Sequence, residues 1–546
     1  MMPSRRPFRP LAAACGLALA ALVAGCDAGF DGTEADNQAP DTELSIRDVS
    51  LVDNFEGRPG LTSTITVSWS GTDPDGYVDA FDIRFFSSDS IAFYDANPDA
   101  GWTRTASRDT TALLPIPGGE ASANVAFEVR AVDNAGAVDP EPARTVFPIR
   151  NSPPTATLSS LELPPDTTWP VISFVLGGDD PDGFVDVTGI DVSFNDSTRF
   201  VRLPAEAEFV TFVATDPGAE TTDAEVFLGR ALVPTGLTVP DLRLNSDNVL
   251  FVRSADRTDT TSTVLRYPAE GSDRAFYVRQ VQSEVLLVND YRSSRDETVL
   301  PFHRETLSDY LGGAAYDEWD LSEPSQVLGT ASPAYSDNLP TSTDPTLGRT
   351  LRLWKYVYWV SKQATDRVRG NNLPLAATVF DGFFADGGRL FVNVPIDIPN
   401  VASAAGDNAA IALLPTSGFV VPETPQLSLR LRAETPIVPV ANVPGTDRPL
   451  PALQTARLLT GARPFEVGGG VVPLYEADAF YLSPTNEDWT GSQVVASMDE
   501  SRRVALMGLP LVRETTGGLD FVGLDGEEDA AAEAIQLILE GLTFPN

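Results

Sequence analysis

The side chains that most often carry nucleophilic or metal chemistry are scarce in this sequence of 546 residues. It contains two cysteines, Cys15 and Cys26, and a single histidine, His303. Zinc sites built from several His or Cys ligands are therefore excluded. A Ser-His-Asp relay would need His303, yet no G-x-S-x-G segment is present to supply its nucleophile. We interpret His303 as a residue at the start of a predicted helix or on the surface.

Carboxylates are the remaining candidates for chemistry, and two loops present them at a regular spacing. The segment DPDGYVD recurs 107 residues later as DPDGFVD. Loops present oxygen ligands to calcium at alternate positions, which makes these residues candidate ligands: Asp73, Asp75, Asp79, Asp180, Asp182 and Asp186. The alternative, which we favour, is a plain turn, because Pro fixes φ, Gly accepts positive φ, and neither loop has the bidentate Glu of an EF-hand. No cofactor other than calcium is indicated.

The C-terminal part must supply the elements that position any further site. From residue 283 strands and helices alternate, with strands predicted at 285–288, 316–321, 356–360, 390–394, 494–496 and 504–507, and helices at 302–311, 373–385 and 527–542. The first run, VLLV, is apolar throughout, which is typical of a strand buried on both faces of a parallel sheet. The pattern predicts a doubly wound α/β domain over 283–546, with a strand-rich insertion at about 400–490.

Ligands of open parallel sheets bind at the carboxyl ends of the strands. This rule gives five candidate ligand-binding residues: Asn289, Asp290, Tyr291, Ser361 and Asn393. The alternative is that they are ordinary loop and capping residues. Trp319, Trp354 and Trp359 either form sugar platforms or, as we favour beside buried strands, belong to the core.

The order of the segments VLLVNDY, helix, YDEWD, YVYWVS, helix and ADGGRLFVNVPI resembles the class I glutamine-amidotransferase-like fold, which has a flavodoxin-like sheet. The resemblance covers residues 283–399 and 490–546. In that family the strand after the GG turn leads to an elbow that carries a catalytic cysteine, completed by His and Glu. Here that strand reads FVNVPI without a cysteine, so the resemblance implies a catalytically silent relative with no catalytic residue.

The N-terminal half of the sequence repeats itself. Apolar residues alternate with polar ones at Ile65, Val67 and Trp69, and again 107 positions later at Ile172, Phe174 and Leu176. Such alternation means one buried and one solvated face, as in a two-sheet sandwich. The segment VRAVDNAG at 129–136 resembles fibronectin type III or related immunoglobulin-like modules. We predict two β-sandwich modules, at 41–150 and 151–282.

The sequence is strongly acidic, with 77 Asp and Glu against 38 Lys and Arg and a net charge of −39. A charge of this size repels nucleic acid, so we expect no nucleic-acid partner. Only two of the basic residues are lysines, Lys355 and Lys362. The acidic excess also resembles the surfaces of proteins from salt-loving organisms, where counterions screen self-repulsion.

Residues 1–25 follow the plan of an export signal. Three arginines precede an apolar stretch, 11–24, that is too short for a comfortable transmembrane helix. The run LVAGC at 22–26 resembles the lipobox of bacterial lipoproteins, which implies cleavage before Cys26 and lipid on its sulfur. The alternative is an ordinary cleavable signal with a chance cysteine. Residues 26–40 are acidic and aperiodic, which predicts a flexible tether.

Two hypotheses about function follow. In the first, an extracytoplasmic protein is anchored to the bacterial membrane through lipid, and its sandwiches form a stalk. Its terminal domain then binds a protein, glycan or small ligand, or serves envelope structure, without catalysis. In the second, the protein is a cell-surface hydrolase that uses carboxylates, with carbohydrate as candidate substrate. A deep pocket with two close carboxylates and aromatic residues would favour the hydrolase.

Overall fold

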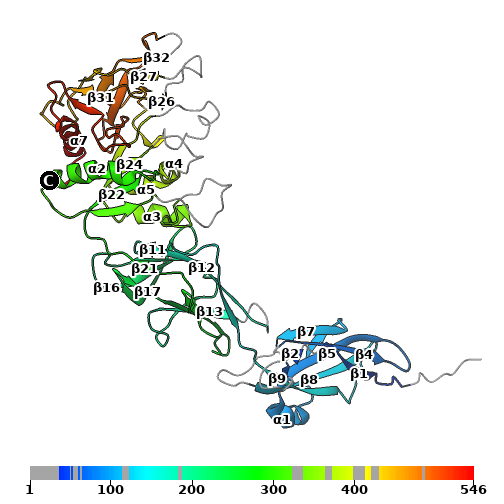
Figure 1. Cartoon of the computed structure of the whole chain (residues 1–546). Helices are drawn as coiled ribbons and strands as arrows, with labels where there is room; N and C mark the ends of the chain where they lie inside the picture. The colour runs from blue at the N-terminus through cyan, green and yellow to red at the C-terminus, as the bar shows by residue number, and fades with distance from the viewer. Residues whose placement is uncertain are drawn as a thin grey trace, which may run out of the picture. The chain divides into compact units, whose positions relative to one another are not determined.

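The computed structural model describes residues 36–48, 51–52, 60–61, 64–113, 122–181, 187–322, 336–362, 372–396, 412–419, 429–460, 462–481 and 486–546. The chain divides into two compact units, Met1–Ser152 and Pro153–Asn546 (Figure 1). The predicted lipidation site Cys26 and two candidate calcium ligands, Asp182 and Asp186, lie outside the described residues.

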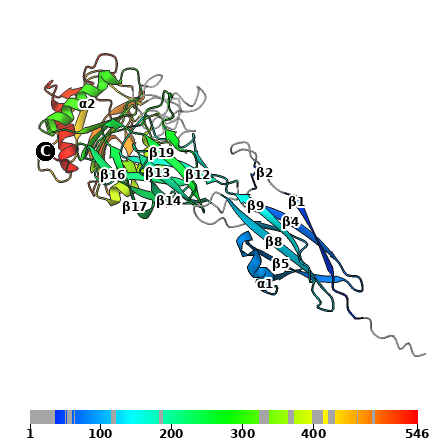
Figure 2. The same ribbon diagram turned by 90° about the horizontal axis from the view of Figure 1, so that it is seen from below.

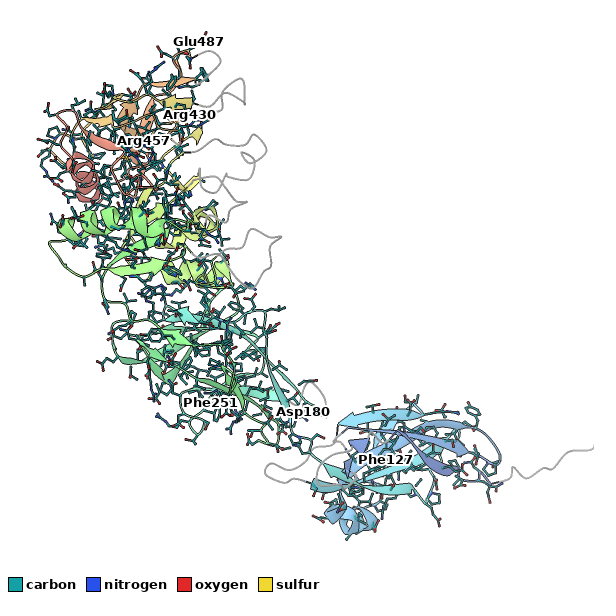
Figure 3. All side chains as sticks on the ribbon, viewed as in Figure 1. Phe127, Asp180, Phe251, Arg430, Arg457 and Glu487 are labelled. Carbon is teal, nitrogen blue, oxygen red and sulfur yellow. The ribbon has the colours of Figure 1, made fainter. Side chains whose placement is uncertain are left out.

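The first unit is a sandwich of two sheets. One sheet has the order β1 (Asp41–Asp48), β4 (Thr64–Thr72) and β7 (Asp109–Leu113). The other has the order β2 (Leu51–Val52), β3 (Gly60–Leu61), β9 (Ala143–Arg150), β8 (Ser122–Asp133), β5 (Val78–Ser87) and β6 (Thr103–Thr105). Their inner faces meet at Val67, Trp69, Phe81 and Phe127, the last of which is labelled in Figure 3. The rings of Trp69 and Phe127 lie 5.6 Å apart. Alternate residues of β4 thus form the core, as predicted.

The outer face of β5 and β8 carries buried charge. Arg84 and Glu128 form an ion pair of 2.5 Å, and their side chains are only 4% and 0% exposed. The segment after β5, which includes the short helix α1 (Ile91–Ala96), supplies Trp102, whose ring lies 4.0 Å from the Arg84 guanidinium carbon. Burying a charge costs free energy unless the charge is paired and hydrogen-bonded. The ion pair therefore explains how both side chains can be buried under the segment after β5.

The second unit begins with another sandwich (Figure 2). Its larger sheet has the order β10 (Thr155–Leu158), β12 (Val171–Asp179), β15 (Phe209–Ala214), β16 (Thr221–Leu228) and β17 (Val233–Arg243). The facing sheet has the order β14 (Val201–Pro204), β13 (Val187–Phe194), β19 (Leu250–Asp256) and β20 (Leu265–Tyr267). A small sheet of β11 (Thr167–Thr168), β21 (Tyr277–Val278) and β18 (Ser246–Asp247) lies beside them.

The repeat seen in the sequence is a repeat of structure. Strand β12 begins and ends 107 residues after β4. In both sandwiches an aspartate at the end of a central strand, Asp133 or Asp256, accepts hydrogen bonds from two backbone N–H groups of the following turn. Phe174, Phe194 and Phe212 fill the second core. The prediction of tandem β-sandwiches is confirmed.

The rest of the second unit is built on a ten-stranded sheet. Five strands pair in parallel, in the order β23 (Asp317–Asp320), β22 (Val285–Asp290), β24 (Tyr356–Ser361), β25 (Arg389–Asn393) and β34 (Val504–Met507). Antiparallel strands extend the sheet through β33 (Val494–Asp499), β31 (Val471–Ala477), β28 (Pro436–Pro439), β29 (Leu453–Thr455) and β35 (Phe521–Gly523). Strands of the predicted insertion therefore join the same sheet.

Helices cover both faces of the parallel strands (Figure 1). Val285 and Leu287 of β22 pack in one cluster with α2 (Asp296–Tyr310) and α7 (Ala530–Gly541). Leu286 and Val288 pack in another, with residues of η3 (Thr343–Leu347), α3 (Gly348–Leu351), α4 (Leu373–Ala376) and α5 (Asp381–Ala385). Burial on both faces explains why β22 is apolar throughout.

Two helix predictions need correction. Helix α2 begins at Asp296 and not at residue 302, because acidic Asp296 and Glu297 belong to its first turn, where they interact favourably with the helix dipole. His303 therefore lies in the interior of the helix and is 1% exposed, so the interpretation as a helix-start or surface residue is wrong. The helix predicted at 373–385 is divided into α4, the 3-10 turn η5 (Ala377–Val379) and α5.

The second sandwich and the sheet that follows it share a hydrophobic core. Trp169 of the sandwich packs in the same cluster as Trp319 and Trp354, and its ring lies 4.6 Å from that of Trp354. Arg279 covers Trp169, with its guanidinium carbon 4.4 Å from the ring centroid. None of the helices in the described part of the chain is long and apolar enough to span a membrane.

Candidate functional site

The carboxyl ends of the parallel strands bring the predicted ligand-binding residues together. Asp290 at the end of β22 lies opposite Ser361 at the end of β24, and Val360 lies opposite Asn393 at the end of β25. Since neighbouring parallel strands end at the same edge, these side chains come from three adjacent strand ends. We call this edge the carboxyl edge.

Asp290 links several elements at the carboxyl edge through hydrogen bonds. Its carboxylate accepts hydrogen bonds from Asn372 Nδ2 at 2.6 Å, from the backbone N–H groups of Asn372 and Leu373 at 3.1 Å, and from Trp359 Nε1 at 3.1 Å. Burial raises the pKa of Asp290 to about 7, although the hydrogen bonds from Asn372 and Trp359 act to lower it. Both carboxylate oxygens are thus engaged in joining β22, β24 and the start of α4.

The two asparagines of the predicted set also have protein partners. Asn289 Nδ2 donates to Asp296 at 3.1 Å and to Asp320 at 3.2 Å. Asn393 Nδ2 donates to the carbonyl oxygens of Met507 and Leu509 at 3.0 and 3.1 Å. Ser361, like both asparagines, is buried. In this structure these side chains hold the strand ends and loops in place.

A second, more exposed group of polar side chains lies at this edge, and of its members only Tyr291 was identified from the sequence. We call it the switch-point cluster: Tyr291, Ser293, Lys362 and Glu514. Lys362 Nζ lies 2.8 Å from Glu514 Oε1, and the Ser293 hydroxyl hydrogen-bonds to the same oxygen. The ammonium also lies 5.9 Å from the Tyr291 ring centroid. The side chains of Lys362 and Glu514 are 31% and 29% exposed, so solvent reaches them.

Electrostatics keep Glu514 ionised. Burial alone would raise the pKa of Glu514, but the hydrogen bonds from Lys362 and Ser293 outweigh it and hold that pKa below its usual value. Burial raises the pKa of Tyr291, which keeps the phenol protonated. The cluster therefore presents an ammonium, a carboxylate and hydroxyl groups.

The place of the cluster follows from strand order. The first strand, β22, lies between the second, β23, and the third, β24. The chain that leaves β22 enters α2 on one face of the sheet, and α4, which follows β24, lies on the other face. Loops that diverge in this way mark the topological switch point of the parallel strands, which is where open α/β sheets bind ligands.

The first candidate calcium loop is held by internal hydrogen bonds. The N–H of Asp75 donates to Asp73 Oδ1 at 3.3 Å, and the N–H of Tyr77 donates to Asn134 Oδ1 at 2.9 Å. A Cβ on Gly76 would lie 2.2 Å from that same Asn134 oxygen, so glycine is required there. Burial raises the pKa of Asp73. These contacts are those of a turn.

The second loop is described only in part. Asp180 lies at the end of β12 (Figure 3), and its backbone N–H donates to Asp179 Oδ1 at 3.0 Å. Among all described residues, no group of three or more His, Cys, Asp or Glu side chains is arranged to hold a metal ion. Calcium binding at these loops stays a prediction.

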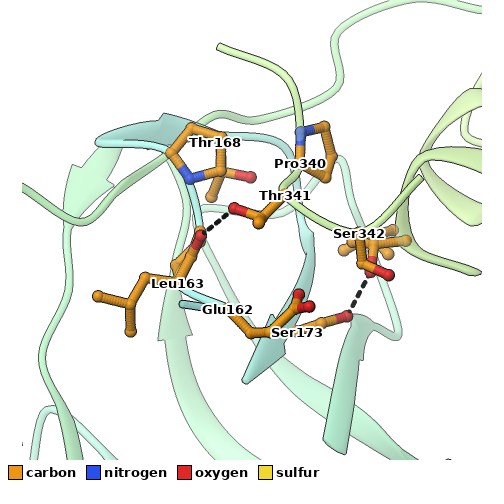
Figure 4. A pocket seen from close by; sticks show the side chains of 11 residues that line it. Glu162, Leu163, Thr168, Ser173, Pro340, Thr341 and Ser342 are labelled. Carbon is orange, nitrogen blue, oxygen red and sulfur yellow. Dashed lines mark hydrogen bonds between the residues drawn. The ribbon is translucent and has the colours of Figure 1, made fainter. Parts of the chain in front are cut away.

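A small pocket lies where the second sandwich meets the segment before η3 (Figure 4). Thr341 Oγ1 donates to the Leu163 carbonyl at 2.9 Å, and Ser173 Oγ lies 2.7 Å from Thr346 Oγ1. Glu162 is the one carboxylate among its lining residues, and none of them is aromatic. It is not the pocket that the hydrolase hypothesis describes. The three tryptophans weighed as sugar platforms, Trp319, Trp354 and Trp359, are buried in the core.

No protein-family model and no curated protein matches the sequence. Solved structures similar to part of it include fibronectin(III)-like modules of Clostridium thermocellum CbhA, at 13% identity and a TM-score of 0.15 over 40% of this chain and 86% of that one. The FN1–FN3 domains of chicken CNTN1 are 10% identical, with a TM-score of 0.14 over 42% of this chain and 98% of theirs. The PKD1 domain of Vibrio anguillarum Epp is 13% identical, with a TM-score of 0.13 over 21% and 98%. Fibronectin type III-like and related β-sandwich modules are thus what this chain is similar to.

Proposed function

We propose that the protein is a lipid-anchored, extracytoplasmic binding protein of the bacterial envelope, in which two β-sandwiches carry a catalytically silent amidotransferase-like domain. The parallel strand order β23-β22-β24-β25-β34 supports the flavodoxin-like part of this proposal, because 2-1-3-4-5 is the order of that fold. Its partner would be a protein, a glycan or a small ligand.

One observation is the main support for the proposed lack of catalysis. At the end of β25, where the resembled family has its nucleophile elbow, the amide of Asn393 is bound to two backbone carbonyl groups. The single histidine supports the same conclusion, since His303 Nδ1 lies 2.7 Å from the Tyr358 hydroxyl inside the core. Neither residue is placed to activate a nucleophile.

The hydrolase alternative would need two carboxylates that reach a substrate. Asp290 and Glu514 are two acids at the carboxyl edge, yet Asp290 is 1% exposed and its oxygens are hydrogen-bonded. We therefore favour binding over hydrolysis.

The lipid anchor can be tested by expressing the full chain in bacteria fed with an alkyne-tagged fatty acid. We expect label in the wild-type chain and in the Cys15→Ala variant, and none in the Cys26→Ala variant. Because Cys15 and Cys26 are the only cysteines, these two variants are a matched pair. Equal labelling of both would contradict the anchor.

Catalysis can be tested on the same purified chain with glutamine, ester and glycoside substrates. We expect no turnover. Release of ammonia, acid or sugar that is abolished by Glu514→Gln would show that the domain is an enzyme.

A further inference from the structure

The switch-point cluster differs from the rest of the carboxyl edge in charge and in access. Asn289, Asp290 and Asn393 are buried and bonded to the protein, whereas Lys362 and Glu514 are about one third exposed. Lys362 comes from the end of β24, Ser293 from the loop after β22, and Glu514 from the chain after β34. Three separate loops thus contribute polar side chains to one solvent-accessible point.

The cluster has cationic neighbours in a chain of net charge −39. Arg295 acts electrostatically on Glu514, and Arg292 acts on Asp290. Asp520 acts in the opposite sense, since burial and, beyond it, the charges of Glu514 and Asp520 raise the pKa of Tyr291, so positive and negative groups are mixed around the cluster. The solvent-accessible ammonium of Lys362 is therefore the group that can receive an anionic part of a ligand, beside the Glu514 carboxylate.

The hydrogen-bonding groups narrow the class of ligand further. An ammonium has three hydrogens, and among the described residues Lys362 makes one ion pair, to Glu514 Oε1. Its remaining hydrogens can serve an anionic oxygen of a ligand. Glu514 Oε2 can accept a hydrogen bond from a hydroxyl group of the same ligand. The Tyr291 ring lies beside the Lys362 ammonium.

We propose that the switch-point cluster binds a small hydroxylated carboxylate, such as a sugar acid, with the carboxylate on Lys362 and a hydroxyl group on Glu514. The proposal rests on the proposed binding function of this domain, and it adds the residues and the chemical class of the ligand. Ser293 positions Glu514 through its hydrogen bond, so it is a positioning residue.

The lysine content of the chain provides a direct test. Lys362 and Lys355 are the only lysines, and exposed Lys355 lies before β24, at the opposite end of that strand from Lys362. The full chain is treated with an amine-acetylating reagent, and acetylation of each lysine is followed by mass spectrometry. Glucuronate is the probe, with glucose as its neutral counterpart and sodium chloride at equal ionic strength as the salt control.

We expect glucuronate to slow acetylation of Lys362 severalfold and to leave Lys355 unchanged, whereas glucose and sodium chloride protect neither. The proposal is wrong if glucuronate fails to protect Lys362, if glucose or salt protects it equally, or if Lys355 is protected to the same extent.

A binding measurement with variants completes the test. Glucuronate binding to the full chain, followed by calorimetry, should be lost in Lys362→Met and kept in Lys355→Met, which is the same change at the other lysine. Unchanged binding in Lys362→Met would overturn the proposal. Fatty-acid labelling of Cys26 is scored separately, so failure here is distinguishable from failure of the lipid-anchor proposal.

Discussion

Replacing Asp290 by asparagine should change the pH dependence of stability in a direction that the structure fixes. The substitution keeps the size of the side chain but removes its titratable proton. It also places an NH2 group among the donors that now point at the carboxylate, from Asn372, Leu373 and Trp359. Since a donor cannot accept these hydrogen bonds, we expect Asp290→Asn to be destabilised at low pH, where both side chains are neutral.

The sign of the pH effect follows from the pKa. Burial raises the pKa of Asp290 from 3.8 to about 7, so the folded state favours the protonated acid. The stability that this group contributes is fully present below the ordinary pKa of 3.8, and it is lost as pH rises through about 7. At about 1.4 kcal/mol for each pKa unit, the loss is on the order of 4 kcal/mol in the free energy of unfolding.

The assay is urea unfolding of the wild-type chain and of Asp290→Asn at a series of pH values. Subtracting the two curves removes the contribution of the other carboxylates, which both chains share. The advantage of the wild type over the variant should shrink as pH rises from about 4 to about 7. Asp525→Asn, a change at an exposed aspartate of the same unit, is the control and should give a difference that is flat with pH. An Asp290→Asn difference that is equally flat would refute the reasoning, because it would mean that the four donors keep Asp290 ionised throughout.

Four further predictions concern buried side chains. Trp169→Ala should destabilise the second unit by about 3–5 kcal/mol in scanning calorimetry, as expected for a large core truncation. Trp69→Ala should affect the first unit alone. A cost of less than about 1 kcal/mol for Trp169→Ala would mean that the core shared by the second sandwich and the following sheet contributes little to stability. Glu128→Gln should lower the stability of the first unit by about 3 kcal/mol, because it leaves buried Arg84 without its full charge partner, and an unchanged melting temperature would contradict this. Tyr358→Phe should cost about 1–3 kcal/mol by removing the hydrogen-bond partner of buried His303. Burial lowers the pKa of His303 to about 3, so its NMR signals should not titrate near neutral pH, and a midpoint near the usual 6.5 would disprove its burial.

The sequence was most informative where the spacing of apolar residues along a strand shows which of its faces are buried. Alternation through Val67 and Trp69 predicted the half-buried strands of the sandwiches, and the unbroken VLLV run predicted a strand covered on both faces. The predicted ligand residues did come to lie at one edge, because neighbouring parallel strands end together.

The rest depended on contacts that spacing does not encode. Ser293 and Glu514 are 221 residues apart, and nothing in either loop indicates that they meet. Tyr291 was predicted from its place after the first strand, and Lys362 carried a weaker signal as one of two lysines and the neighbour of the predicted Ser361. His303 was misplaced because the start of its helix was taken six residues too late, which put a core position at a helix end.

The position of Trp169 determines which C-terminal fragments of this protein keep an intact core. A fragment that starts near residue 283 loses this indole and leaves Trp319 and Trp354 uncovered, which is the kind of apolar surface that drives aggregation. A fragment that starts at Pro153 keeps the indole with its partners. The second sandwich therefore covers part of the C-terminal hydrophobic core and cannot be removed or exchanged as an independent module.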